Sequence, residues 1–229
     1  MLSNQQKDLG KGMVLLLSFA AIFVTLFMPV IKGETPINQL DWLYNSISKG
    51  SVSYIPSLLK ESRQHLGTDI QFSMEMENPA QAGQIASMFT INGIRAETDS
   101  FKITISGDLG AITGRILSDA DHMFHNNGSG IHQKYSREEK RVLYDWWLAL
   151  KAMSKELKAQ KRFDDAAYVM SVQTKAVECS FNYYGIESQD ILDQAHLVVL
   201  SLVFYVFYTV WFGYAILFFM TGMGLKLEQ

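Results

Sequence analysis

The chain of 229 residues carries a formal net charge of −3 and contains a single cysteine. The nearly balanced charge and the absence of zinc-finger and RNP-like patterns exclude nucleic acid as an expected partner. One cysteine cannot form an intramolecular disulfide. Without a C-x-x-C-H motif, the chain also has no conventional site for covalent haem attachment.

Two apolar segments without charged residues are the clearest features of the sequence. The first, residues 13–31, lies between Lys11 and Lys32, and the second, residues 196–225, is strongly apolar after His196. About 20 apolar residues in a helix cross the hydrocarbon core of a bilayer. We therefore expect two transmembrane helices. We expect the first to be an uncleaved anchor, because its apolar run exceeds the roughly 7–15 residues of a signal peptide.

Two crossings place both termini on the same side of the membrane. Lys7 and Lys11 lie in the N-terminal tail, residues 1–12, and Lys226 lies in the C-terminal tail. Basic residues in short flanks favour the cytoplasmic side. The sequence thus predicts a multi-pass protein of the inner (cytoplasmic) membrane with cytoplasmic termini, and residues 33–195 are then extracytoplasmic.

The extracytoplasmic segment begins with residues 33–66, where apolar residues at helical spacing predict two short helices. The stretch TDIQFSMEMEN then alternates apolar and polar residues, which is the pattern of a half-buried strand. Asn78 before Pro79 predicts the start of a helix, and Gly93 fits its end.

A β-hairpin is predicted next, with its turn at Asp99 and Ser100, and Asp108 can cap a following helix. The order strand, helix, strand, strand, helix over residues 67–125 predicts a small α+β sandwich with helices on one face of a sheet. This order resembles half of a ferredoxin-like fold. The resemblance is topological and implies no function.

The NNGSG motif marks a joint in the chain, and we expect a flexible loop over residues 126–135. Beyond it, helical spacing of apolar residues predicts a helical hairpin over residues 136–185, with its turn at KAQKRFDD. The predicted fold class is therefore an α+β membrane protein. Two transmembrane helices flank a domain that consists of a β-α-β-β-α sandwich and a helical hairpin.

The strongest candidate for site chemistry is the stretch SDADHMFHNNGSGIH. Asp119, His122 and His125 are spaced by three, which predicts one shared side of a helix, and His132 could fold back across the glycine loop. One carboxylate with two or three imidazoles can bind Zn²⁺ or a similar divalent metal. The alternative is a polar helix end, where histidine interacts well with the helix dipole. No other cofactor is predicted, because the chain has no H-E-x-x-H motif, P-loop or G-x-S-x-G elbow.

The second apolar segment differs from a simple anchor, because its aromatic residues are not confined to its ends. Tyrosine hydroxyls deep in a bilayer need hydrogen-bond partners, and glycine allows another helix to approach closely. Three roles compete: packing against other membrane subunits, plain anchoring, and lining a lipid or quinone groove. Packing is favoured. The candidate partner-interface residues are Tyr205, Tyr208, Trp211 and Gly213 in this segment, and Trp146 and Trp147 in the helical hairpin.

The preferred hypothesis for function is a non-catalytic accessory subunit of a larger integral membrane complex. Its partners would be other integral membrane subunits, the lipid bilayer and a periplasmic protein docked on the outer domain. One alternative is a membrane-tethered metal-binding protein or metal-dependent enzyme that uses Asp119, His122 and His125. A second alternative is a homo-oligomeric pore. Neither apolar segment contains a charged residue, so an ion path would need unwound backbone or tyrosine hydroxyls.

Overall fold

The computed structural model describes residues 4–51 and 53–225, which form two compact units. Unit 1 combines Met1–Gly50 with Ser188–Gln229, and unit 2 is Ser51–Glu187. Residues 1–3 of the predicted N-terminal tail and Lys226 of the C-terminal tail lie outside the described residues.

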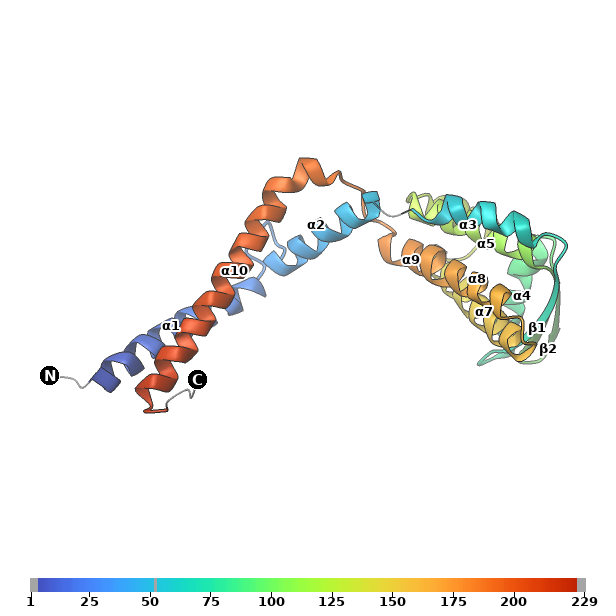
Figure 1. The fold of residues 1–229 in the computed structure, drawn as a ribbon. Coiled ribbons are helices and arrows are strands. Elements are labelled where there is room, and N and C mark those ends of the chain that lie inside the picture. The colour runs from blue at the N-terminus through green and yellow to red at the C-terminus, as the bar shows by residue number, and fades with distance from the viewer. Residues whose placement is uncertain (1–3, 52, 226–229) are drawn as a thin grey trace. The chain divides into compact units, whose positions relative to one another are not determined.

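Unit 1 is built from helices α1 (Asn4–Leu26), α2 (Pro36–Ser51) and α10 (Ile191–Gly222). Helices α1 and α10 lie side by side and run antiparallel (Figure 1). Both are long and apolar enough to cross a membrane, and the only described residue that is buried in each is Gly12 in α1 and Ala215 in α10. That exposure argues against a core helix of a soluble protein, and α1 and α10 are therefore candidate membrane-spanning helices.

Glycine permits the close approach of α1 and α10. A Cβ atom on Gly12 would overlap the backbone of Phe219, and one on Gly222 would overlap the backbone of Leu9. This is the small-residue packing that brings helices together in a membrane. Helix α1 begins earlier than the predicted residue 13 and ends at Leu26 instead of residue 31. Pro29 explains the early end, because proline has no N–H and disfavours helical geometry in the residue before it.

Unit 2 contains the predicted strand, helix, strand, strand, helix order. Two capping predictions are confirmed: the side chain of Asn78 accepts from Gln81 N at 2.9 Å, and that of Asp108 accepts from Ala111 N at 2.7 Å. The elements are α3 (Ile55–Ser62), η1 (Arg63–His65), β1 (Asp69–Glu75), α4 (Pro79–Ile91), β2 (Arg95–Asp99), β3 (Lys102–Asp108) and α5 (Leu109–Phe124).

The sheet has the order β1-β3-β2, and all its pairs are antiparallel. Along β1 the side chains of Ile70, Phe72 and Met74 are buried, while their neighbours are exposed. Helices α4 and α5 therefore cover one face of the sheet, as the alternation predicts. After α5 the chain continues into further helices instead of a fourth strand, so β1 stays at an edge of the sheet.

The second half of unit 2 is helical: α6 (Gly128–Tyr135), α7 (Glu139–Ala159), α8 (Phe163–Val172), the π-helical segment η2 (Gln173–Glu178) and α9 (Cys179–Tyr183). The structure differs here from the predicted flexible loop over residues 126–135, because α6 occupies most of it. Ile131 and Tyr135 lie four positions apart and are both buried, so one face of this short helix joins the core.

The sandwich and the helical hairpin share one hydrophobic core. Trp146 on α7 is fully buried and meets the ring of Phe89 on α4 edge-on, with ring centroids 5.0 Å apart. Helix α7 also packs against α8 and against β1 (Figure 1). The two segments predicted as separate parts of the outer domain are therefore one compact unit.

Candidate functional site

The three-stranded sheet has two edge strands, β1 and β2, and the edge at β1 defines the candidate site. Hydrogen-bonded pairs alternate along an antiparallel ladder. The bond from Met76 N to Phe101 O, 2.8 Å long, continues the ladder just past the end of β1 and shows that even-numbered residues of β1 bond to β3. The N–H and C=O groups of the odd-numbered Ser73 and Glu75 therefore point to the open edge.

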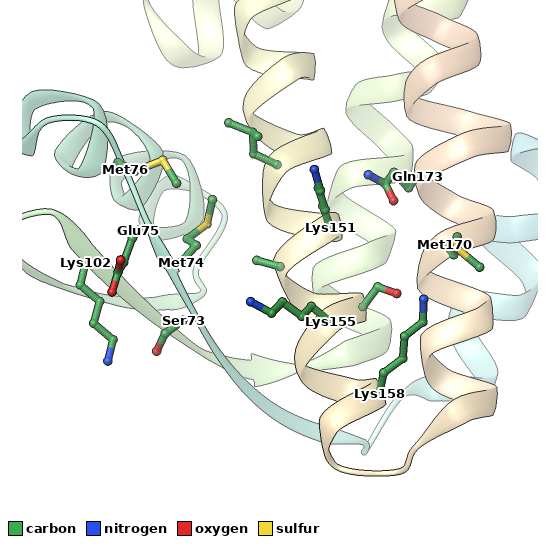
Figure 2. A pocket seen from close by; sticks show the side chains of 13 residues that line it. Ser73, Met74, Glu75, Met76, Lys102, Lys151, Lys155, Lys158, Met170 and Gln173 are labelled. Atoms are coloured by element: carbon green, nitrogen blue, oxygen red, sulfur yellow. The ribbon is translucent and has the colours of Figure 1, made fainter.

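A groove of about 850 Å³ runs between this open edge and helix α7 (Figure 2). Lys151 and Lys155 are four positions apart on α7, and Lys158 is three further on, so they share one face of the helix. Lys155 extends from α7 toward β1 (Figure 2). Lys102 contributes a fourth ammonium group, against the single carboxylate of Glu75.

The positive charge of this basic groove is not neutralised within the described part of the chain. None of the four lysines forms an ion pair with another described residue. The ammonium group of Lys151 lies over the ring of Trp147, 5.1 Å from its centroid, which fixes its position without removing its charge. The groove therefore combines unpaired backbone groups of a strand with a fixed excess of positive charge, an arrangement suited to binding an anionic ligand.

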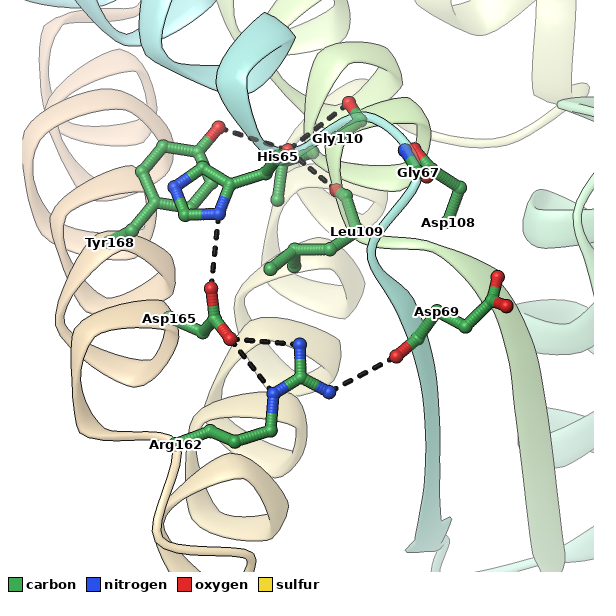
Figure 3. Close-up of polar contacts among 10 residues, drawn as sticks. His65, Gly67, Asp69, Asp108, Leu109, Gly110, Arg162, Asp165 and Tyr168 are labelled. Atoms are coloured by element: carbon green, nitrogen blue, oxygen red, sulfur yellow. Dashed lines mark hydrogen bonds and ion pairs between the residues drawn. The ribbon is translucent and has the colours of Figure 1, made fainter.

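Arg162, in the turn between α7 and α8, bonds to the start of β1 (Figure 3). Its Nη1 donates to the backbone oxygen of Asp69 at 3.1 Å, and its Nε and Nη2 each lie 2.8 Å from Asp165 Oδ2. Asp69 is an odd-numbered residue of β1, so this bond occupies an outward carbonyl at the start of the strand. The open part of the edge therefore begins after Asp69, and Ser73 and Glu75 are the odd-numbered residues of β1 that line the groove.

A part-buried polar network extends from Asp165 on the other side of Arg162 (Figure 3). Asp165 Oδ1 lies 3.1 Å from Nδ1 of His65, whose ring stacks on Tyr168 with centroids 4.2 Å apart. The Tyr168 hydroxyl donates to Thr113 Oγ1 at 3.0 Å. Burial raises the pKa of Tyr168 to about 12. These contacts join η1, α5 and α8, and of these elements α8 contributes Met170 to the lining of the groove.

Asp119, the carboxylate of the predicted metal site, is turned into the core. It is 1% exposed and accepts hydrogen bonds from Lys134 Nζ at 2.8 Å, from Trp146 Nε1 at 2.9 Å and from the Tyr135 hydroxyl. Burial, followed by the nearby charge of Asp119, raises the pKa of Tyr135, so the hydroxyl keeps its proton and donates it. Three donors thus satisfy the carboxylate within the protein.

The three histidines of that prediction lie apart from Asp119 and have other hydrogen-bond partners. His122 Nδ1 lies 3.1 Å from Asn127 Nδ2, His125 Nδ1 lies 2.9 Å from Asp121 O, and His132 Nδ1 lies 2.9 Å from Arg137 O. Each residue turns a helix by about 100°, so each spacing of three drifts by about 60° around it. Within the described residues, no three histidine, cysteine or carboxylate side chains gather as a metal site would require. The metal hypothesis stays a prediction.

The two tryptophans predicted at a partner interface occupy different environments. Trp146 has no exposed surface in this structure and contributes to the core. Trp147 is half-buried beside the basic groove, and its indole N–H donates to Glu178 Oε1 at 2.6 Å. Gln173, which lines the groove, donates to the Trp147 backbone oxygen at 3.3 Å.

The predicted interface residues of α10 divide between its inner and outer faces. Tyr208 is on the inner face, where its ring stacks on Phe19 of α1 with centroids 4.2 Å apart and its hydroxyl donates to Phe19 O at 3.3 Å. Trp211 is half-buried, and its indole N–H has no acceptor among the described residues. Tyr205 and Gly213 are exposed, and no atom lies within 4 Å of a Cβ placed on Gly213.

The sequence patterns did not single out the lysines of the basic groove. Their spacing of four and three along α7 was a readable signal of one basic face. This spacing indicates a binding site only once the structure shows that β1 lies opposite the basic face of α7.

No family model matches this sequence, and no curated protein or solved structure matches it.

Proposed function

We propose that the protein is a non-catalytic accessory subunit of a larger membrane complex, held in the bilayer by α1 and α10. The proposal depends on how deep the exposed tyrosines of α10 lie. If Leu197–Leu225 is the crossing, Trp211 is its midpoint. A rise of 1.5 Å per residue then puts Tyr205 about 9 Å and Tyr214 about 5 Å from the midpoint. Both lie inside a hydrocarbon core of about 30 Å.

The observation that carries the proposal is that these two hydroxyls have no partner among the described residues. Tyr205 and Tyr214 are 64% and 55% exposed, and neither hydroxyl bonds to another described residue. An unsatisfied polar group in hydrocarbon costs several kcal/mol. Acceptors on helices of another subunit would satisfy both hydroxyls, and the open surface at Gly213 allows such a helix to approach closely.

Native mass spectrometry of the protein extracted from its own membranes in mild detergent tests this proposal. We expect assemblies with other polypeptides, and we expect the Tyr205→Phe/Tyr214→Phe variant and the Gly213→Leu variant to lose them. The matched control is Gly10→Leu, which adds the same bulk at another helical glycine with open space around it. A lone monomer or a pure homo-oligomer of the wild type would refute the proposal.

We further propose that this membrane is the inner (cytoplasmic) membrane, with cytoplasmic termini and residues 33–195 outside. Lys7 and Lys11 support this orientation, and the antiparallel packing of α1 and α10 puts the two ends of the chain on one side. In a Cys179→Ser background, Ser129→Cys should react in intact spheroplasts with a membrane-impermeant maleimide, because Ser129 is exposed. Lys7→Cys should react only after lysis, and the reverse pattern would contradict the orientation.

A further inference from the structure

We propose that the basic groove binds an extended acidic segment of another protein, which adds to the open edge of β1 as a fourth strand. This inference concerns unit 2 alone and goes beyond the proposed membrane role. Edge strands bind extended peptides through main-chain hydrogen bonds, and the flanking side-chain environment sets specificity. The register of β1 and the Arg162 bond to Asp69 determine where the ligand pairs, and the four lysines determine its charge.

The backbone groups of β1 determine where the segment pairs. Ser73 and Glu75 each present one N–H and one C=O to the groove, and these groups bond to no other described residue. A strand placed antiparallel to β1 could form four hydrogen bonds with them. Arg162 already occupies the Asp69 carbonyl, and the groove is lined by Ser73 and Glu75, so pairing in the groove takes place at the end of β1 nearer Met76.

The lysines determine the charge of the segment. Four ammonium groups line the groove against one carboxylate, that of Glu75. Aspartate or glutamate side chains of an added strand would reach Lys151 and Lys155 on α7, and Lys102 on the neighbouring strand. Lysines also protect edge strands from unwanted pairing. If the lysines recognise a ligand, an acidic peptide should bind in the groove. If they only protect the edge strand, it should not bind.

The test measures binding of a fluorescent ten-residue peptide that alternates glutamate with valine to the full-length protein in mild detergent. We expect saturable binding that weakens with added salt, because salt screens exposed charges. The Lys151→Gln/Lys155→Gln variant should bind about tenfold more weakly, because it loses two charge-assisted contacts. A lysine–valine peptide should not bind.

Strand pairing is tested separately from charge attraction. A glutamate–valine peptide N-methylated at alternate residues keeps its charge but cannot pair along that edge, and it should lose binding. Ser73→Pro removes an outward N–H that β3 does not use and should weaken binding, whereas Ser73→Ala keeps that N–H and should bind like the wild type. Circular dichroism establishes that Ser73→Pro is folded, and the N-methylated peptide gives the same discrimination if it is not.

Two outcomes would overturn the inference. If the glutamate–valine peptide does not bind the wild type at low salt, the lysines only protect the edge. If the N-methylated peptide binds as tightly as the unmodified one, the groove attracts acidic chains without strand addition.

Discussion

Replacing Asp119 with alanine should destabilise unit 2 strongly, because the carboxylate is the acceptor of a buried hydrogen-bond network. Trp146 N–H and the Tyr135 hydroxyl both donate to it, and both groups are buried. Each buried donor left without an acceptor costs about 1–3 kcal/mol. Lys134 is one-third exposed and can turn to water, so it adds little. The expected loss is therefore about 2–6 kcal/mol, a large part of the roughly 5–15 kcal/mol that stabilises a typical domain.

Urea unfolding of the full-length protein in mild detergent, followed by tryptophan fluorescence, measures this loss. Asp119→Asn keeps one acceptor oxygen and should lose less than Asp119→Ala. A His122→Ala/His125→Ala variant should unfold like the wild type, because both histidines are at the surface. If Asp119→Ala unfolds within about 1 kcal/mol of the wild type, the network does not stabilise the fold as argued. If EDTA destabilises the wild type as much as the alanine variant, a metal role for Asp119 would replace the structural one.

Three further predictions follow from the packing. Gly12→Leu should separate α1 from α10, because a side chain there overlaps the backbone of α10. A cysteine cross-link between the two helices should then be lost, and it should persist in Gly10→Leu, where space is open. The free energy of unfolding should fall as pH rises from about 10 to 12, because an unfolded tyrosine loses its proton near pH 10 while folded Tyr168 keeps it. Tyr168→Phe should reduce this slope without abolishing it, because the pKa of buried Tyr135 is raised as well, and an equal slope in both proteins would contradict the assignment. Arg162→Ala should lower the hydrogen-exchange protection at the start of β1 and cost about 1–3 kcal/mol, whereas Arg115→Ala, at an exposed position, should change neither. Unchanged protection in Arg162→Ala would show that this side chain does not hold the start of β1.

The sequence by itself determined the local elements and the apolar character of the two long helices. The cap at Asn78, the cap at Asp108 and the alternation along β1 all appear in the structure. Each of these signals depends on residues no more than a few positions apart. The length and composition of α1 and α10 are likewise properties of consecutive residues.

Side-chain direction around a helix was only partly predictable. A spacing of three suggested that Asp119, His122 and His125 share one side of α5, yet the 60° drift per step turns Asp119 into the core and leaves the histidines outside. The glycine-rich stretch after α5 suggested a loop. Burial of Ile131 and Tyr135 against the core instead stabilises a helix there, because tertiary packing overrides weak local preference.

Only the tertiary structure decided that β1 lies at an edge of the sheet and that α7 lies opposite it. Ser73 and Lys155 are far apart in the sequence, and they line one groove because β1 takes the edge position and α7 packs beside it. The same long-range packing buries Trp146 and leaves the lysines of α7 unpaired. Contacts of this kind depend on the whole arrangement of strands and helices, and the chain gains them only when the complete core of unit 2 forms.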